Sequence, residues 1–167
     1  MNLQFYLAKL KESDEFRNFC KSNPDCFLTS GFFVIDKISD DNKQHFDFST
    51  KEDKVFSFLV DDGCKISEKD NFSKETFEKI NSKIDIDFSG IEELIRKRMG
   101  EENIQNTLQK IILSLQCINR QHFLVGTAFI SGMGMINLNI DLEKMEIAVF
   151  EKKSFFDILR VKKKEKD

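Results

Sequence analysis

The chain has 167 residues, of which 40% are hydrophobic and 33% charged, and its net charge is -3 at pH 7. This length and balance are typical of one compact globular unit and exclude a mainly disordered chain. Since the chain is weakly acidic, it has no general attraction for phosphate backbones. The most apolar stretch, 123–136, is shorter than the about 20 residues that span a bilayer. The N-terminal segment is amphipathic and not a signal-peptide core, so we expect a cytoplasmic protein without a transmembrane segment.

The first third of the chain predicts a helix followed by three strands. Apolar residues recur at helical spacing over 3–20, and Asn23-Pro24 ends that pattern. Strands are expected over 26–38, 44–49 and 55–60, with turns between them that are rich in Asp, Asn, Lys and Ser.

The middle of the chain predicts helices. Ser73 is a candidate N-cap, and a hydrophobic staple would join Phe72 to Phe77. A short alternating stretch over 84–88 follows. Ser89 and Glu92 then fit a capping box that opens a helix through Met99.

The last third predicts a second helix-and-strands unit. A stripe of apolar residues indicates an amphipathic helix over 104–118, formed by Ile104, Leu108, Ile111, Ile112, Leu115 and Ile118. Strands are expected over 123–130, 135–140 and 145–150. Ser154 is a candidate cap for a short final helix over 155–161.

The expected fold is therefore α+β, with two tandem helix-then-three-stranded antiparallel meander units in one compact chain of 167 residues. The first unit would cover 1–67, a helical connector 68–100, and the second unit with a basic tail 101–167. Phe27-Leu28 and Phe33-Val34 stand at the same offsets as Phe123-Leu124 and Phe129-Ile130, which favours an internal repeat. A helix lying across a meander buries one face of each.

The region 103–150 resembles a PepSY-type, cystatin-like unit. The resemblance is carried by the segment 136–141 (Ile-Asn-Leu-Asn-Ile-Asp), by Glu143 and by Glu146-Ile147, which follow the expected helix. They are similar to the family's closing strand, aspartate-led turn and final strand, although the family's turn glycine is missing. The resemblance implies a binding or regulatory module without catalytic residues.

No pattern in the sequence predicts a catalytic, cofactor or metal site. The four cysteines, Cys20, Cys26, Cys64 and Cys117, form no C-x-x-C pair, and we interpret them as buried reduced thiols. His45 and His122 are expected beside strands, where surface histidines are common. The pair Asp85 and Asp87 is expected to face water. Gly132-Met133-Gly134 precedes a strand and no helix, so it predicts a turn and no phosphate loop.

The C-terminal segment is the best sequence candidate for a binding surface. Its apolar and basic residues alternate as in a basic amphipathic helix: Phe155, Phe156, Ile158, Leu159, Arg160, Lys162 and Lys163. Packing against the chain's own sheet is the ordinary interpretation of such a helix. A protein partner is the functional interpretation, with a nucleic acid or a membrane surface as further alternatives.

The functional hypothesis is a non-catalytic protein-interaction or regulatory binding module that needs no cofactor and has a protein partner or associates with itself. The alternative is a small-ligand binder or enzyme with a pocket between sheet and helices.

Overall fold

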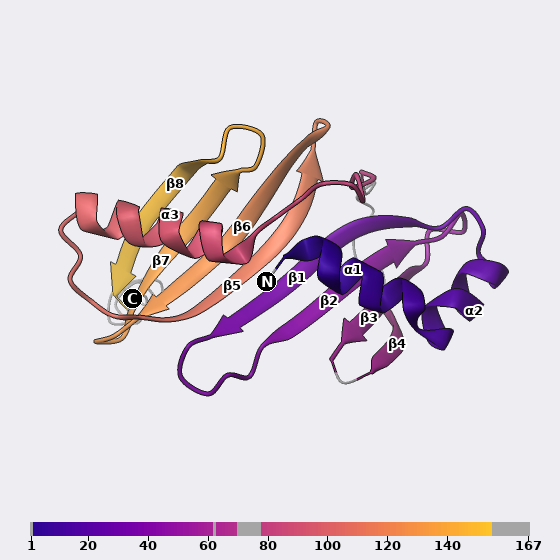
Figure 1. The fold of residues 1–167 in the computed structure, drawn as a ribbon. Helices are drawn as coiled ribbons and strands as arrows, with labels where there is room; N and C mark the ends of the chain where they lie inside the picture. The colour runs from indigo at the N-terminus through magenta and orange to yellow at the C-terminus, as the bar shows by residue number, and fades with distance from the viewer. Residues whose placement is uncertain (1, 62, 70–77, 155–167) are drawn as a thin grey trace, which may run out of the picture.

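The computed structural model describes residues 2–61, 63–69 and 78–154, which form three helices and one eight-stranded antiparallel sheet (Figure 1). The helices are α1 (Leu3–Glu12), α2 (Asp14–Ser22) and α3 (Phe88–Glu101). The strands are β1 (Phe27–Asp36), β2 (Lys43–Ser49), β3 (Val55–Val60), β4 (Cys64–Lys69), β5 (Leu108–Ile118), β6 (Gln121–Ile130), β7 (Gly134–Asp141) and β8 (Glu146–Ser154). The fold is α+β, as the sequence predicts.

The strand order is β4-β3-β2-β1-β5-β6-β7-β8. Every neighbouring pair except one joins strands that follow each other in the chain. The exception is β1 with β5 at the centre of the sheet, where Phe33 lies opposite Leu113. This order leaves β4 and β8 as the two edge strands.

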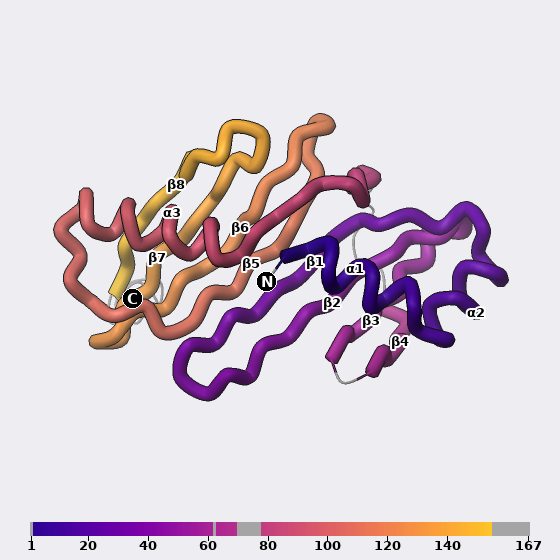
Figure 2. The backbone as a smooth tube through the Cα atoms, in the orientation of Figure 1, coloured from indigo at the N-terminus to yellow at the C-terminus, as the bar shows by residue number. Residues whose placement is uncertain are grey.

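All described helices lie on one face of the sheet (Figures 1 and 2). Helices α1 and α2 lie over the β1–β4 half, and α3 lies over the β5–β8 half. Strand alternation sends Phe33, Phe46 and Phe58 to the helix face, where each is at most 1% exposed. On the other face, Phe32 is 38% and Val149 is 39% exposed. The main core therefore lies between the sheet and the helices.

Side-chain caps fix where the helices begin. The Asn2 side chain accepts a hydrogen bond from the Phe5 amide (2.9 Å) and starts α1. Ser13 ends α1 and caps α2, so the helix expected over 3–20 is two helices. The carboxylate of Asp87 accepts from the amides of Ser89 and Gly90, so Asp87 caps α3, two residues before the expected cap at Ser89.

The connection that leads into α3 is packed but not helical over 78–87. The amide of Ile80 donates to the carbonyl of Leu28 (2.8 Å), and the amide of Leu3 donates to the carbonyl of Ile86 (2.9 Å). Ile80 and Ile86 are almost fully buried. The helical connector expected over 68–100 is therefore wrong for these residues. The expected cap at Ser73 lies outside the described residues.

The amphipathic helix predicted over 104–118 is wrong, because residues 108–118 form the strand β5. Within it, Ile111, Leu113 and Leu115 are fully buried and alternate towards the helices, while Ile112 and Ser114 point to the other face. The apolar residues of this run recur at spacings that fit both periods. Contact with β1 on one side and β6 on the other selects the strand.

Each half of the sheet has four strands, and the sequence predicts three. In the first half the missed strand is β4, which is almost wholly exposed and has little apolar pattern. In the second half it is β5. The internal repeat expected from the sequence aligns residues 27–34 with 123–130 and so matches β1 with β6. In the strand order of the sheet, the strand of the second half that corresponds to β1 is β5. The expected alignment of the two repeats therefore does not match the strand order.

Candidate functional site: a hollow between α3 and the edge strand β8

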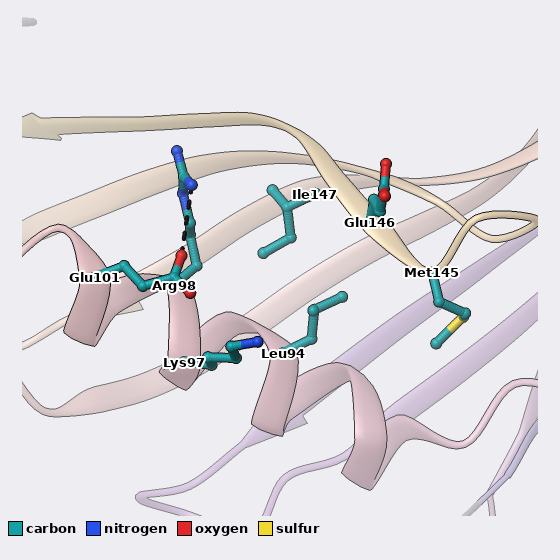
Figure 3. A pocket seen from close by; sticks show the side chains of 7 residues that line it. All are labelled: Leu94, Lys97, Arg98, Glu101, Met145, Glu146 and Ile147. Atoms are coloured by element: carbon teal, nitrogen blue, oxygen red, sulfur yellow. Dashed lines mark ion pairs between the residues drawn. The ribbon is translucent and has the colours of Figure 1, made fainter.

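A hollow of about 320 Å³ opens between α3 and the start of β8 (Figure 3). Helix α3 contributes four lining residues and the β7–β8 turn with the first residues of β8 contributes three: Leu94, Lys97, Arg98, Glu101, Met145, Glu146 and Ile147. Ile147 leans towards the helix in Figure 3, and Glu146 points away from it. The hollow therefore has an apolar base with charged groups at its rim.

Arg98 forms a fixed wall of the hollow. Its guanidinium pairs with the carboxylate of Glu102 (2.8 Å) and that of Glu101 (3.5 Å), one turn further along α3. It also lies 5.7 Å from the ring centroid of Phe150 on β8, in a cation–π contact. These contacts link the helix to the strand, while the Nε of Arg98 has no hydrogen-bond partner among the described residues.

Lys97 differs from its neighbour Arg98 in its ion pairing. It lies on the exposed side of α3 and lines the hollow, and no ion pair holds its ammonium group within the part of the chain that the structure describes. An ammonium group in this position can bind a carboxylate or another hydrogen-bond acceptor.

Strand β8 borders the hollow and, within the described strands, pairs with β7 alone. A bulge at Ala148 separates the start of the strand from its regular part, in which Val149 to Ser154 lie opposite Asn139 to Gly134. An edge strand presents a row of backbone donors and acceptors that a further strand can use. The hollow and the edge of β8 therefore adjoin each other.

A second, smaller hollow of about 190 Å³ lies where β1 ends and α3 begins. Asp36, one of its lining residues, is only 4% exposed. Its carboxylate accepts from the ammonium of Lys110 (2.7 Å), the amide of Ile38 and the hydroxyl of Ser39. The Lys110 contact is the main cause that holds the pKa of Asp36 well below its ordinary value. Because these partners use the carboxylate to close the turn after β1, we regard this hollow as structural.

The two histidines are not brought together. His45 lies on β2, on the face away from the helices, with its ring edge-on to Phe32 (6.0 Å between centroids). Burial lowers its pKa. His122 lies at the start of β6, and its Nε2 accepts from the amide of Asn81 (3.2 Å). His122 lies opposite Cys117 in the β5–β6 pairing, and the thiol of Cys117 donates to Glu78 (3.5 Å). Among the described residues, no group of side chains around either histidine could hold a metal ion.

The other sequence candidates have structural roles or lie outside the described residues. Asp87 caps α3, Asp85 is exposed, and Gly132 and Met133 form the left-handed turn between β6 and β7. All four cysteines are free and half-buried. The candidate binding residues of the tail, 155–163, lie outside the described residues. In the described segments, no helix is both long and apolar enough to cross a bilayer.

Comparisons with known proteins relate the chain to one fold. No family model matches the chain, and no curated protein matches it. Among solved structures it is similar to a "putative lipoprotein" from Clostridium difficile 630, with a TM-score of 0.54 and 12% identity, over 84% of this chain and 91% of that one. At this identity the likeness shows the fold alone. The PepSY-type resemblance and the cytoplasmic location stay predictions.

Proposed function

We propose that this chain is a non-catalytic interaction module that binds an extended segment of a protein partner at β8. The observation that carries the proposal is the regular edge of β8 beside a hollow with an apolar base and with Lys97, for which the described residues provide no ion-pair partner. Strand addition of this kind takes its affinity from backbone hydrogen bonds and its specificity from side-chain pockets.

The backbone of the partner would pair with Val149 to Lys153. Charged side chains in this part of β8, Glu151, Lys152 and Lys153, reduce indiscriminate pairing with other exposed strands. The partner segment would then run past the hollow at the start of the strand. Side chains on one face of a strand recur at every second position, so two of them can reach the hollow together.

The side chains that line the hollow favour an apolar residue and an acidic residue two positions apart. The apolar one would contact Leu94 and Ile147, and the acidic one would pair with Lys97. Exposed ion pairs contribute at most about 1 kcal/mol, so the lysine would act more on the choice of partner than on affinity.

We also infer that the chain consists of two tandem units, each a helical segment followed by a four-strand meander. The support is that each meander runs outward from the centre of the sheet, β1–β4 in one direction and β5–β8 in the other. In this scheme β4 and β8 are equivalent edges. The edge β8 lies beside a hollow, which makes it the better candidate for binding.

A selection from a library of random peptides tests the proposal. The wild-type protein should enrich peptides with an acidic and an apolar residue two positions apart. Lys97→Glu should lose this enrichment, whereas Lys65→Glu, on the opposite edge strand β4, should keep it. Hydrogen exchange with an enriched peptide should protect those amides between Val149 and Lys153 that point away from β7. Equal enrichment by both variants, or protection located on β4, would overturn the proposal.

The volume of the hollow also suggests a second function, because 320 Å³ lies at the lower end of the range for small-ligand sites. A small molecule retained by the purified protein in native mass spectrometry, and lost in Leu94→Glu, would favour this alternative. Self-association through β8 would appear instead as a dimer that Lys97→Glu weakens.

A further inference from the structure

Two of the four cysteines lie close together in the first half of the molecule. The Sγ atoms of Cys20 and Cys26 are 3.8 Å apart. Cys20 is in the last turn of α2, and Cys26 directly precedes β1. Both side chains are half-buried at the border of the core. Cys64 and Cys117 have other neighbours, Ser13 and Glu78 respectively.

The chain between the two cysteines is a tight, fixed turn. The amide of Asn23 donates to the carbonyl of Phe19 (2.9 Å) and closes α2. The amide of Cys26 then donates to the carbonyl of Asn23 (3.1 Å), so residues 23–26 form a turn with Pro24 in its second position. The turn places both thiols on the same side. A disulfide needs the sulfurs at about 2.05 Å, and rotation of the two side chains about their Cα–Cβ bonds can cover a gap of this size.

We propose that Cys20 and Cys26 form an intramolecular disulfide when the protein meets a small-molecule disulfide. In the first step the thiolate of one cysteine attacks that oxidant and releases one thiol, which leaves a mixed disulfide on the protein. The second thiolate then attacks the protein sulfur of the mixed disulfide and releases the second thiol. The two cysteine thiols lose two electrons and two protons, and the oxidant becomes two thiols.

The bond would fasten α2 to the sheet. Helix α2 contacts the sheet through Phe16 and Phe19, which pack on Phe48, Phe56 and Phe58. It ends at Ser22, and the turn over 23–26 connects its last residues to β1. A cross-link from Cys20 to Cys26 keeps this end of the helix in place even when the aromatic contacts open. The inference does not depend on the proposed site at β8.

Oxidised glutathione and peptide mapping test this on the full chain. Trypsin cuts after Arg17, Lys21 and Lys37, so residues 18–21 and 22–37 separate unless the disulfide joins them. After oxidation of the wild type and of the double variant Cys64→Ser/Cys117→Ser, these two peptides should appear as one cross-linked species. The single variants Cys20→Ser and Cys26→Ser should not give it.

The oxidised wild-type protein should also melt roughly 5 °C above the reduced protein, because the closed loop restricts the unfolded chain. Cys20→Ser should show no such shift. Glutathione that stays attached to either cysteine, or a cross-link to Cys64 or Cys117, would overturn the proposal. An unchanged melting temperature in the cross-linked protein would contradict the claim that the disulfide holds the end of α2 against the sheet.

Discussion

At the scale of single residues, the end of β1 depends on one carboxylate. Asp36 is nearly buried and accepts hydrogen bonds from the Lys110 ammonium, from two amides, those of Ile38 and Ser39, and from the Ser39 hydroxyl. Its neighbour Lys37 pairs with Glu92 on α3 (2.6 Å). Asp36 thus fixes the turn after β1, and Lys37 links this turn to the first part of α3.

We expect Asp36→Asn to lower the melting temperature at pH 7 by roughly 5 °C, because an amide cannot replace the charge opposite Lys110. The pKa of Asp36 is held below its ordinary value, so its contribution is fully present above the unfolded-state pKa of about 3.9 and is lost as the pH falls towards the folded-state pKa. Thermal melts from pH 7 to pH 3 should therefore show the two proteins converging below about pH 4.

The exposed Asp85 provides a matched control, since Asp85→Asn changes the same chemical group without that network. It should melt within about 1 °C of the wild type at every pH. A constant gap between Asp36→Asn and the wild type down to pH 3 would show that the lost stability does not come from the ionised carboxylate.

At the scale of elements, the pairing of β5 with β6 depends on one glycine. A Cβ atom at Gly126 would lie 1.9 Å from the carbonyl oxygen of Ile112 and 3.0 Å from the Cα of Leu113. Both obstacles are backbone, so the two strands would have to separate. We expect Gly126→Ala to destabilise the protein by about 3 kcal/mol.

Urea unfolding measures this loss, and Gly100→Ala is the control. Gly100 lies in α3 with no atom near its missing side chain, so alanine there should stabilise the helix by up to about 1 kcal/mol. A loss of less than about 1 kcal/mol for Gly126→Ala would mean that the strands adjust around the methyl group.

The attachment of α2 depends on an aromatic cluster. Phe58 is fully buried, and its ring centroid lies 5.2 Å from that of Phe16, 5.1 Å from that of Phe19 and 5.6 Å from that of Phe48. We expect Phe58→Ala to cost about 4 kcal/mol, since the cavity removes contacts from helix and sheet together.

The exposed Phe5 gives a control for phenylalanine removal. It is 62% exposed, so Phe5→Ala should stay within about 0.5 kcal/mol of the wild type in urea unfolding. Amide exchange in α2 should accelerate in Phe58→Ala before exchange in α3 does. Equal acceleration in both helices would show that the cluster does not hold α2 locally.

The sequence predicts elements well where local signals agree, and fails where they compete. Helix α2 ends at Ser22 because Pro24 follows, β2 and β7 alternate, and β3 and β6 are apolar runs between turns, so the sequence predicts their bounds to within two residues. Strand β5 was predicted as a helix because its isoleucines and leucines fit both periods. Its pairing with β1 and β6 at the centre of the sheet selects the strand, and this long-range contact is not encoded in the local sequence pattern.

The sequence predicts a pocket between sheet and helices as the alternative hypothesis, but neither its place nor its lining residues. The helix ending near Met99 and the strand starting near Met145 are both expected from the sequence. Their contact requires α3 to cross the sheet as far as β8, the fourth strand that follows it. No spacing in the sequence encodes this crossing, so neither Lys97 nor Ile147 stands out before the fold is known.

At the scale of the whole molecule, the two halves meet at a central seam. Strands β1 and β5 pair over 31–36 and 110–115. Above this seam, the ring of Phe33 lies 5.8 Å from that of Phe46 on β2 and 4.7 Å from that of Phe88 at the start of α3. One side chain of β1 thus contacts elements from both halves. The packed connection over 78–87 adds further bonds between α1 and the start of α3.

This seam predicts that the halves unfold together. A shared core and a continuous sheet should give one urea transition, seen at the same midpoint by far-ultraviolet circular dichroism and by hydrogen exchange of β3 and of β7. We expect Phe33→Ala to lower the midpoint for both strands equally, at a cost of about 4 kcal/mol. If exchange in β7 kept its wild-type midpoint while exchange in β3 shifted, the halves would be separate folding units joined only by strand pairing.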